Sequence, residues 1–123
     1  MNKNRPVNLN LAAFSFPVTS ISSIVHRITG VLLFLSIPFC LWALDQSLTP
    51  DGFVKVKAVL SGVFAKIILW AILSMLAYHI IAGVRHLLMD AGIGETLEGG
   101  RAGAYAVIVL GVVVAALIGV WIW

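Results

Sequence analysis

Three long runs without an acidic or basic side chain other than histidine constrain this chain more than any other feature. They contain 17, 18 and 22 residues and cover residues 28–44, 67–84 and 102–123. A helix needs about 20 mostly apolar residues to cross the hydrocarbon core of a bilayer, and the polar flanks of the first two runs can supply the remainder. The sequence therefore predicts three transmembrane helices, at about 22–45, 64–90 and 103–123.

The composition agrees with this prediction. Of the 123 residues, 61% are hydrophobic and 11% are charged, whereas a soluble domain carries about 25% charged residues. We therefore expect an all-α integral membrane protein that forms a single membrane-anchor domain, with a polar segment at 1–21. The net charge of +3 is spread over the helix flanks without a basic cluster, so membrane lipid is an expected partner and nucleic acid is not.

The cationic flanks predict an orientation. Five cations lie on the side of the N-terminus: Lys3, Arg5, Arg27, Arg85 and Arg101. Three lie in the connection between the first two helices: Lys55, Lys57 and Lys66. This excess favours an N-terminus inside and a C-terminus outside. The connection itself runs from Asp45 to about Phe64, and we expect residues 49–52 (Thr-Pro-Asp-Gly) to form a turn in it.

A polar stripe runs along the second predicted helix. At about 100° per residue, His79, Gly83, His86 and Asp90 fall on one narrow face. An ionisable group in hydrocarbon is costly and is a functional-site hypothesis by default. The stripe must therefore face protein or a ligand, and not lipid.

A second polar face opens the first predicted helix. Ser23, His26, Arg27 and Gly30 are related by steps of three and four residues, so they share one side of the helix. If the N-terminus lies inside, this side is near the inner membrane surface, to which the end of the second helix also returns. The two clusters should therefore converge on a binding site near that surface.

The residue types at this site suit two ligands. A neutral imidazole such as His79 is an axial ligand for haem iron, and Gly83 removes a side chain where a flat macrocycle must approach. His26 and Arg27 are suitable counter-charges for the haem propionates. Ser23 and Arg27 can alternatively donate to a quinone carbonyl, because a nearby cation stabilises the charge that develops on the reduced oxygen.

Helix geometry limits how the histidines can share a metal. His79 and His86 lie about 10 Å apart along one helix, so both cannot bind the same iron. His26 is the remaining histidine of the chain, and its place near the interface suits a propionate or a quinone better. We therefore favour an opposing haem ligand from a second subunit.

Other readings of the same residues stay open. His79 can simply bond a neighbouring helix, and Arg27 and Arg85 can extend to the lipid headgroups. Asp90 can pair with an arginine, so the roles of Arg85, His86 and Asp90 are undecided. At the level of function, two alternatives remain: a haem-free structural membrane anchor, and a small proton-coupled transporter subunit that uses His79 or Asp90.

Both clusters also resemble a known family. The elements Ser-x-x-His-Arg-x-x-Gly at 23–30 and His-x-x-x-Gly-x-Arg-His at 79–86, with the leader at 5–11, the segment at 16–22, Tyr78 and Asp90, look like the cytochrome b subunit of succinate dehydrogenase, which is a membrane anchor of complex II. The resemblance covers nearly the whole chain, including its length and its three spans.

The resemblance implies a non-flavin subunit of succinate:ubiquinone oxidoreductase, an enzyme of electron transport and the tricarboxylic acid cycle in the bacterial inner membrane. Such a subunit forms half of a heterodimeric helix bundle with a second three-helix anchor subunit, and the two hold haem b between them. Flavoprotein and iron–sulfur subunits, which carry FAD and the iron–sulfur clusters, dock on the cytoplasmic side. The C-terminus is then periplasmic.

Carried over by motif position, the resemblance also implies residue roles. His79 would be the haem axial ligand and so the ligand of the haem iron, opposed by a ligand from the partner anchor. Ser23 and Arg27 would bind ubiquinone. His26 and Arg27 would meet the haem propionates.

Overall fold

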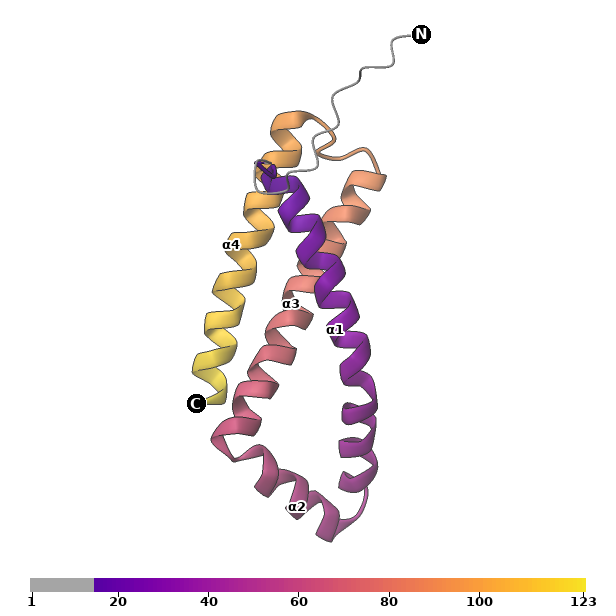
Figure 1. Ribbon diagram of the computed structural model, residues 1–123, viewed down its shortest axis with the longest axis vertical. Helices are drawn as coiled ribbons and strands as arrows, with labels where there is room; N and C mark the ends of the chain where they lie inside the picture. Colours follow the sequence, from indigo (N-terminus) through magenta and orange to yellow (C-terminus); the bar gives the residue numbers. More distant parts are fainter. Residues whose placement is uncertain (1–14) are drawn as a thin grey trace, which may run out of the picture.

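From residue 15 onward, the protein consists of helices joined by short connections (Figure 1). The computed structural model describes residues 15–123. Its elements are α1 (Val18–Ser47), α2 (Pro50–Leu60), α3 (Val63–Asp90) and α4 (Leu97–Ile122). By length and composition α1, α3 and α4 can each cross a membrane. The prediction of an all-α membrane protein with three spans is confirmed.

Local sequence explains where the spans begin. α1 begins after Pro17, which is extended, and continues through Pro38. Val18 to Ile21 therefore belong to the helix, whereas residues 1–14 of the expected polar segment lie outside the described residues. α4 begins at Leu97, before the uncharged run itself, because the Thr96 hydroxyl accepts a hydrogen bond from the Gly99 amide at 3.0 Å. Such a cap satisfies one of the free amides of a first helical turn.

The connection between the first two spans differs from the expectation. Residues 49–52 were expected to form a turn, but they cap and begin α2. The Thr49 hydroxyl accepts from the Gly52 amide at 3.1 Å, Pro50 stands at the first helical position and Asp51 lies in the first turn. Each of these features stabilises a helix N-terminus. The turn prediction was wrong because turns and helix starts use the same residue types.

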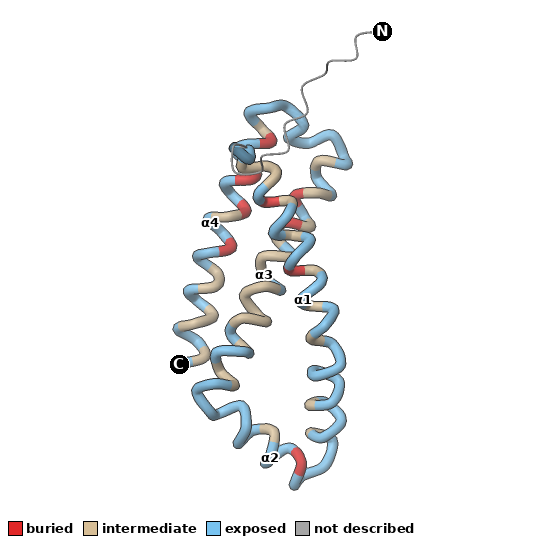
Figure 2. Tube along the Cα trace, in the orientation of Figure 1, coloured by how far each residue is buried: buried red, intermediate tan, exposed pale blue. Residues whose placement is uncertain are grey.

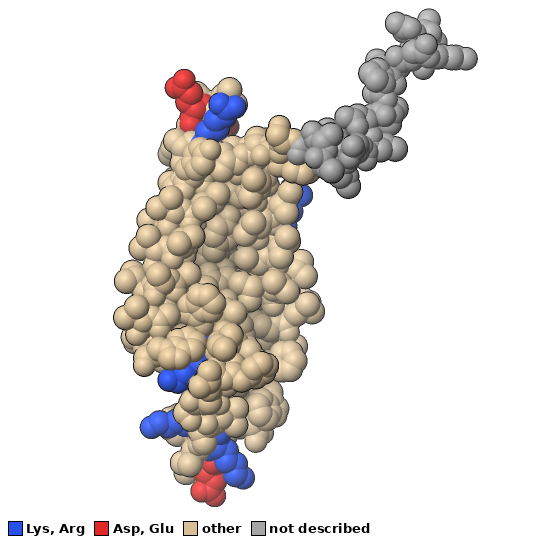
Figure 3. Space-filling model, turned by 60° about the vertical axis from the view of Figure 1, so that its left-hand side comes forward, with Lys and Arg blue, Asp and Glu red and all other residues tan. Residues whose placement is uncertain are grey.

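Helices α3 and α4 lie along each other, whereas α1 crosses α3 near the start of α1 and diverges from it toward α2 (Figure 1). The start of α1, the end of α3 and the start of α4 therefore share one end of the bundle. Most of the buried residues gather at this end (Figure 2). Charged side chains lie at the two ends of the molecule and leave an uncharged band between them on the face shown in Figure 3, as expected for a bundle that crosses a bilayer.

Glycines on α4 allow α3 to pack closely against it. A β-carbon at each of three glycines would meet a large α3 side chain: Gly103 meets Arg85 Nε at 3.1 Å, Gly111 meets Tyr78 Cδ2 at 2.7 Å, and Gly119 meets Trp70 Nε1 at 3.3 Å. Small residues at such positions let membrane helices approach each other.

The same three α3 side chains bond backbone oxygens with their polar tips. Trp70 Nε1 donates to Ala115 O at 2.8 Å, and Arg85 Nη2 donates to Gly100 O at 3.0 Å. The Tyr78 hydroxyl lies 3.2 Å from Ser22 O and 3.3 Å from the Ser22 hydroxyl oxygen, and Ser22 is fully buried. Polar groups within hydrocarbon need such partners because no water is available there.

This packing predicts that Gly111→Leu destabilises the protein. A β-carbon there would already overlap Tyr78, and overpacking of a filled interface costs about 1–3 kcal/mol. We expect a lower midpoint of thermal unfolding in detergent, followed by circular dichroism. Val112→Leu is the matched control because Val112 is exposed. Equal midpoints for the two variants would contradict the proposed contact.

Candidate functional site

Three histidines meet where α1 crosses α3. The rings of His26 and His79 are stacked, with centroids 4.1 Å apart and an interplanar angle of 14°. The ring of His86 is tilted by 49° against the ring of His26, at 5.0 Å between centroids. The structure thus brings together the histidines of both predicted polar faces, and His26 contacts both histidines of α3.

Two glycines make this approach possible. A β-carbon at Gly30 would lie 2.9 Å from His79 Cε1, closer than a real β-carbon tolerates. A β-carbon at Gly83 would lie 3.6 Å from His26 Nε2, which is an ordinary contact distance. Each glycine therefore faces a histidine of the other helix, and Gly30 is the tighter position. The role expected for Gly83 beside a haem stays a prediction.

Hydrogen bonds favour one tautomer of the neutral His79 ring. Its Nδ1 atom lies 3.1 Å from His26 O and 3.2 Å from Thr29 Oγ1. Because a carbonyl oxygen can only accept, the tautomer of the neutral ring that makes this bond carries its proton on Nδ1. In this tautomer Nε2 keeps its lone pair, and it makes no hydrogen bond within the part of the chain that the structure describes. This is the state in which an imidazole can bind a metal.

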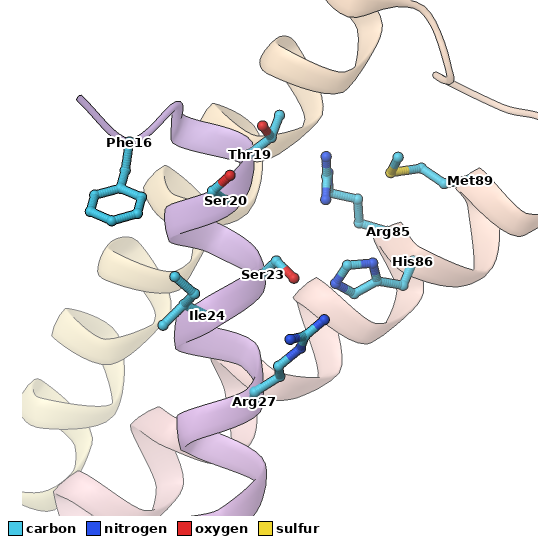
Figure 4. Close-up of a pocket in the computed structure, with 9 residues that line it drawn as sticks. All are labelled: Phe16, Thr19, Ser20, Ser23, Ile24, Arg27, Arg85, His86 and Met89. Carbon is cyan, nitrogen blue, oxygen red and sulfur yellow. The ribbon is translucent and has the colours of Figure 1, made fainter. Parts of the chain in front are cut away.

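A pocket of about 480 Å³ lies beside the histidines, between the start of α1 and the end of α3 (Figure 4). From α1 it is lined by Thr19, Ser20, Ser23, Ile24 and Arg27, with Phe16 just before the helix, and from α3 by Arg85, His86 and Met89. The structure therefore places Ser23 and Arg27 on one wall, as two residues of the predicted quinone site. In Figure 4 the side chains of Ser23 and His86 point toward each other across the space.

The two arginines of the pocket differ in environment. Arg85 is buried, with 9% of its surface exposed, and its guanidinium donates to Gly100 O of α4. The interpretation that Arg85 extends to the headgroups was therefore wrong, because α4 supplies a carbonyl oxygen at its first turn. Arg27 is exposed and forms no hydrogen bond to any residue from 15 to 123. Its guanidinium is available to an anionic or electron-rich ligand.

Asp90 does not join the site. It is the last residue of α3, its side chain is exposed, and it is absent from the pocket lining. The predicted stripe therefore divides: His79, Gly83 and His86 face α1, whereas Asp90 lies beyond the crossing. Within residues 15–123, no group of three or more His, Cys, Asp or Glu side chains is arranged to hold a metal ion.

Sequence reasoning missed several contributors. Thr29 touches His79, although the sequence presented it only as part of a motif. Thr19 and Ser20 precede Ser23 by four and three residues, and Met89 follows His86 by three. Extending each predicted face by one helical turn would have found these three residues.

Comparisons with known proteins agree with this architecture. A family model described as succinate dehydrogenase/fumarate reductase transmembrane subunit matches residues 1–118. The succinate dehydrogenase cytochrome b556 subunit of Coxiella burnetii is 41% identical over the full length of both chains. The cytochrome b556 subunit of Paracoccus denitrificans is 36% identical over 93% of this chain and 88% of its own. The cytochrome b560 subunit of Reclinomonas americana is 36% identical over 80% and 72%.

Proposed function

Since the chain belongs to the succinate dehydrogenase/fumarate reductase transmembrane subunit family, we propose that it is a cytochrome b membrane anchor of succinate:ubiquinone oxidoreductase. In this role it forms a single membrane-anchor domain, holds haem b together with a second anchor subunit, and helps to form the ubiquinone site. The observation that carries this proposal is the position of His79, whose Nδ1 faces His26 O, next to a pocket that contains Ser23 and Arg27.

The donor set around His79 fits a haem ligand. Metal-bound histidines almost always donate their other ring N–H to a carbonyl, a carboxylate or water, and this bond orients the ring. His26 O occupies that position toward Nδ1. His79 Nε2 would hold the iron, with the opposing ligand from the partner anchor, and the bound haem would supply one-electron storage. The exposed Arg27 would pair with a propionate.

His26 has a second task in this proposal. Its carbonyl oxygen orients His79, while its ring stacks on the ring of His79 and faces Gly83. A contact of His26 with a propionate, as the family resemblance implies, remains part of this proposal. His86 contacts His26 and lines the pocket, so we assign it to the wall of the quinone site and not to the iron.

The pocket fits the head of a quinone. Its volume of about 480 Å³ lies within the range of small-molecule sites, about 300–1,000 Å³. The Ser23 hydroxyl would donate to one quinone carbonyl. The Arg27 guanidinium would stabilise the negative charge that develops on that oxygen during reduction, which is the main contribution that a fixed cation can make. Ile24 and Met89 supply apolar walls for the ring.

We also propose an arrangement in the complex. Flavoprotein and iron–sulfur subunits would dock on the end of the bundle that carries the pocket, and their FAD and clusters would deliver the electrons of succinate to the quinone. That end would face the cytoplasm of a bacterial inner membrane, with the C-terminus periplasmic. Arg85 is buried and bonds Gly100 O, so it does not reach the headgroups. Without it, the cations on the side of the N-terminus number four, against three in the connection between the first two spans. Family membership therefore supports this orientation more strongly than the cations do.

A difference spectrum tests the proposal as a whole. The complex that contains this chain is purified from membranes, its subunits are identified by mass spectrometry, and a reduced-minus-oxidised spectrum is recorded. We expect a b-type haem band and four different subunits. A complex that lacks haem would favour the structural anchor. Proton-driven flux in vesicles without haem would favour the transporter subunit.

A further inference from the structure

Thr29 bonds its own helix and also contacts the proposed haem ligand on α3. It lies on α1, inside the membrane span, and 6% of its surface is exposed. Its hydroxyl donates to His26 O of its own helix at 2.9 Å, which is how a threonine in a membrane helix normally satisfies its proton. The Thr29 hydroxyl oxygen also lies 3.2 Å from His79 Nδ1 on α3.

The positions of the protons follow from the three atoms involved. The Thr29 proton points to His26 O, and the His79 proton on Nδ1 is directed between His26 O and Thr29 Oγ1. The imidazole proton is therefore shared by His26 O and Thr29 Oγ1. The Thr29 hydroxyl also donates to His26 O, and this bond polarises Thr29 Oγ1 and makes it a better acceptor. Hydrogen bonds linked in this way strengthen one another in a medium of low dielectric constant.

The contact also restricts how the ring can turn. Two acceptors on the Nδ1 side fix the plane of the imidazole about its bond to Cβ. Gly30 lies against the adjoining Cε1, where a β-carbon would come within 2.9 Å of Cε1 and 3.6 Å of Nδ1. Thr29 and Gly30 are neighbours on the same turn of α1, so one short segment borders the Nδ1–Cε1 edge of the His79 ring.

We propose that Thr29 is a positioning residue for the haem ligand. This inference rests on the proposed ligation of haem by His79. The Thr29 hydroxyl holds the ring in the tautomer with Nδ1 protonated, fixes the ring plane, and makes Nε2 a stronger electron donor by accepting part of the Nδ1 proton. A stronger donor stabilises the oxidised iron more than the reduced iron, so this bond lowers the midpoint potential of the haem.

The test compares two substitutions in the whole purified complex. Thr29→Val keeps the shape of the side chain and removes the hydroxyl, whereas Thr29→Ser keeps the hydroxyl and removes a methyl group. We measure the haem midpoint potential by redox titration and the low-spin signal of the oxidised haem by electron paramagnetic resonance. We expect Thr29→Val to retain haem with a higher potential and an altered signal, and Thr29→Ser to match the unmodified complex in both.

Two results would overturn the proposal. If the midpoint potential and the resonance signal are unchanged in Thr29→Val, the hydroxyl has no role in positioning His79. Equal shifts in Thr29→Val and Thr29→Ser would show that packing alone is responsible. If Thr29→Val fails to assemble, Thr29→Ala removes the same hydroxyl without a branched side chain, and the comparison with Thr29→Ser is made with it.

The variant His79→Ala separates failure of this inference from failure of the proposed function. A normal haem in His79→Ala would show that His79 is not the haem ligand, and the role proposed for Thr29 would fail with it. Loss of haem in His79→Ala together with an unchanged potential in the Thr29 variants would leave the ligand in place and reject only the positioning role.

Discussion

Replacing His79 with alanine is expected to abolish the haem b band of the assembled complex. In the proposed function Nε2 of His79 is one of two iron ligands, and alanine offers no replacement. The substitution also removes the ring that stacks on His26 and fills the space at Gly30. The measurement is the reduced-minus-oxidised spectrum, normalised to the amount of this chain in the purified complex.

Two further variants make this result specific. His86→Ala removes an imidazole that also contacts His26, so it controls for the loss of ring packing, and we expect it to retain haem. His79→Met keeps a side chain that can bind iron, and we expect a haem with a changed spectrum. A haem with two histidine ligands in His79→Ala would show that the axial ligand lies elsewhere.

Replacing Arg27 with glutamine is expected to lower the rate of ubiquinone reduction by about 100-fold, the loss typical when one preorganised stabiliser of developing charge is removed. Succinate oxidation with an artificial soluble acceptor should persist, because that reaction does not need the quinone pocket. Arg27 is exposed on the pocket wall without a hydrogen bond to the described residues, so its loss should not disturb the bundle. Both rates are measured on the same purified complex.

The controls concern charge and assembly. Arg27→Lys keeps the charge but not the planar donor pair, and we expect an intermediate rate. Arg101→Gln removes an exposed cation from the first turns of α4, outside the pocket lining, and should leave both activities unchanged. An equal fall of both activities in Arg27→Gln would indicate an assembly defect and contradict the assignment to the quinone site.

The predictions that succeeded came from the lengths of the uncharged runs and from the helical spacing of polar residues. The three uncharged runs predicted the spans because hydrocarbon thickness sets the length of a spanning helix. Steps of three and four residues placed Ser23, His26 and Arg27 on one face, and the structure has this face against His79 and His86. These patterns are local, so one sequence is enough to see them. The functional roles of these residues stay predictions.

The contacts between helices could not be predicted from the sequence, because they depend on how two helices are rotated against each other. The contact between Thr29 and His79 joins residues 50 positions apart, and no local pattern distinguishes Thr29 from other polar residues on the helix. Arg85 was expected near headgroups because charged side chains at helix ends usually reach them. Its actual acceptor, Gly100 O, follows after the next connection, beyond the reach of a reading along one helix.

The glycine contacts between α3 and α4 have a consequence for the depth of the histidine site. From Trp70 to Tyr78 and from Gly111 to Gly119 the chain advances by eight residues, about 12 Å along each helix. Tyr78 meets Gly111 and Trp70 meets Gly119 only at one axial register of α3 against α4. A shift by a single turn would place Tyr78 and Trp70 against side chains instead of glycines. Helix α4 contributes no residue to the described pocket lining or to the ring contacts. Even so, its register against α3 sets where His79 lies along the bundle.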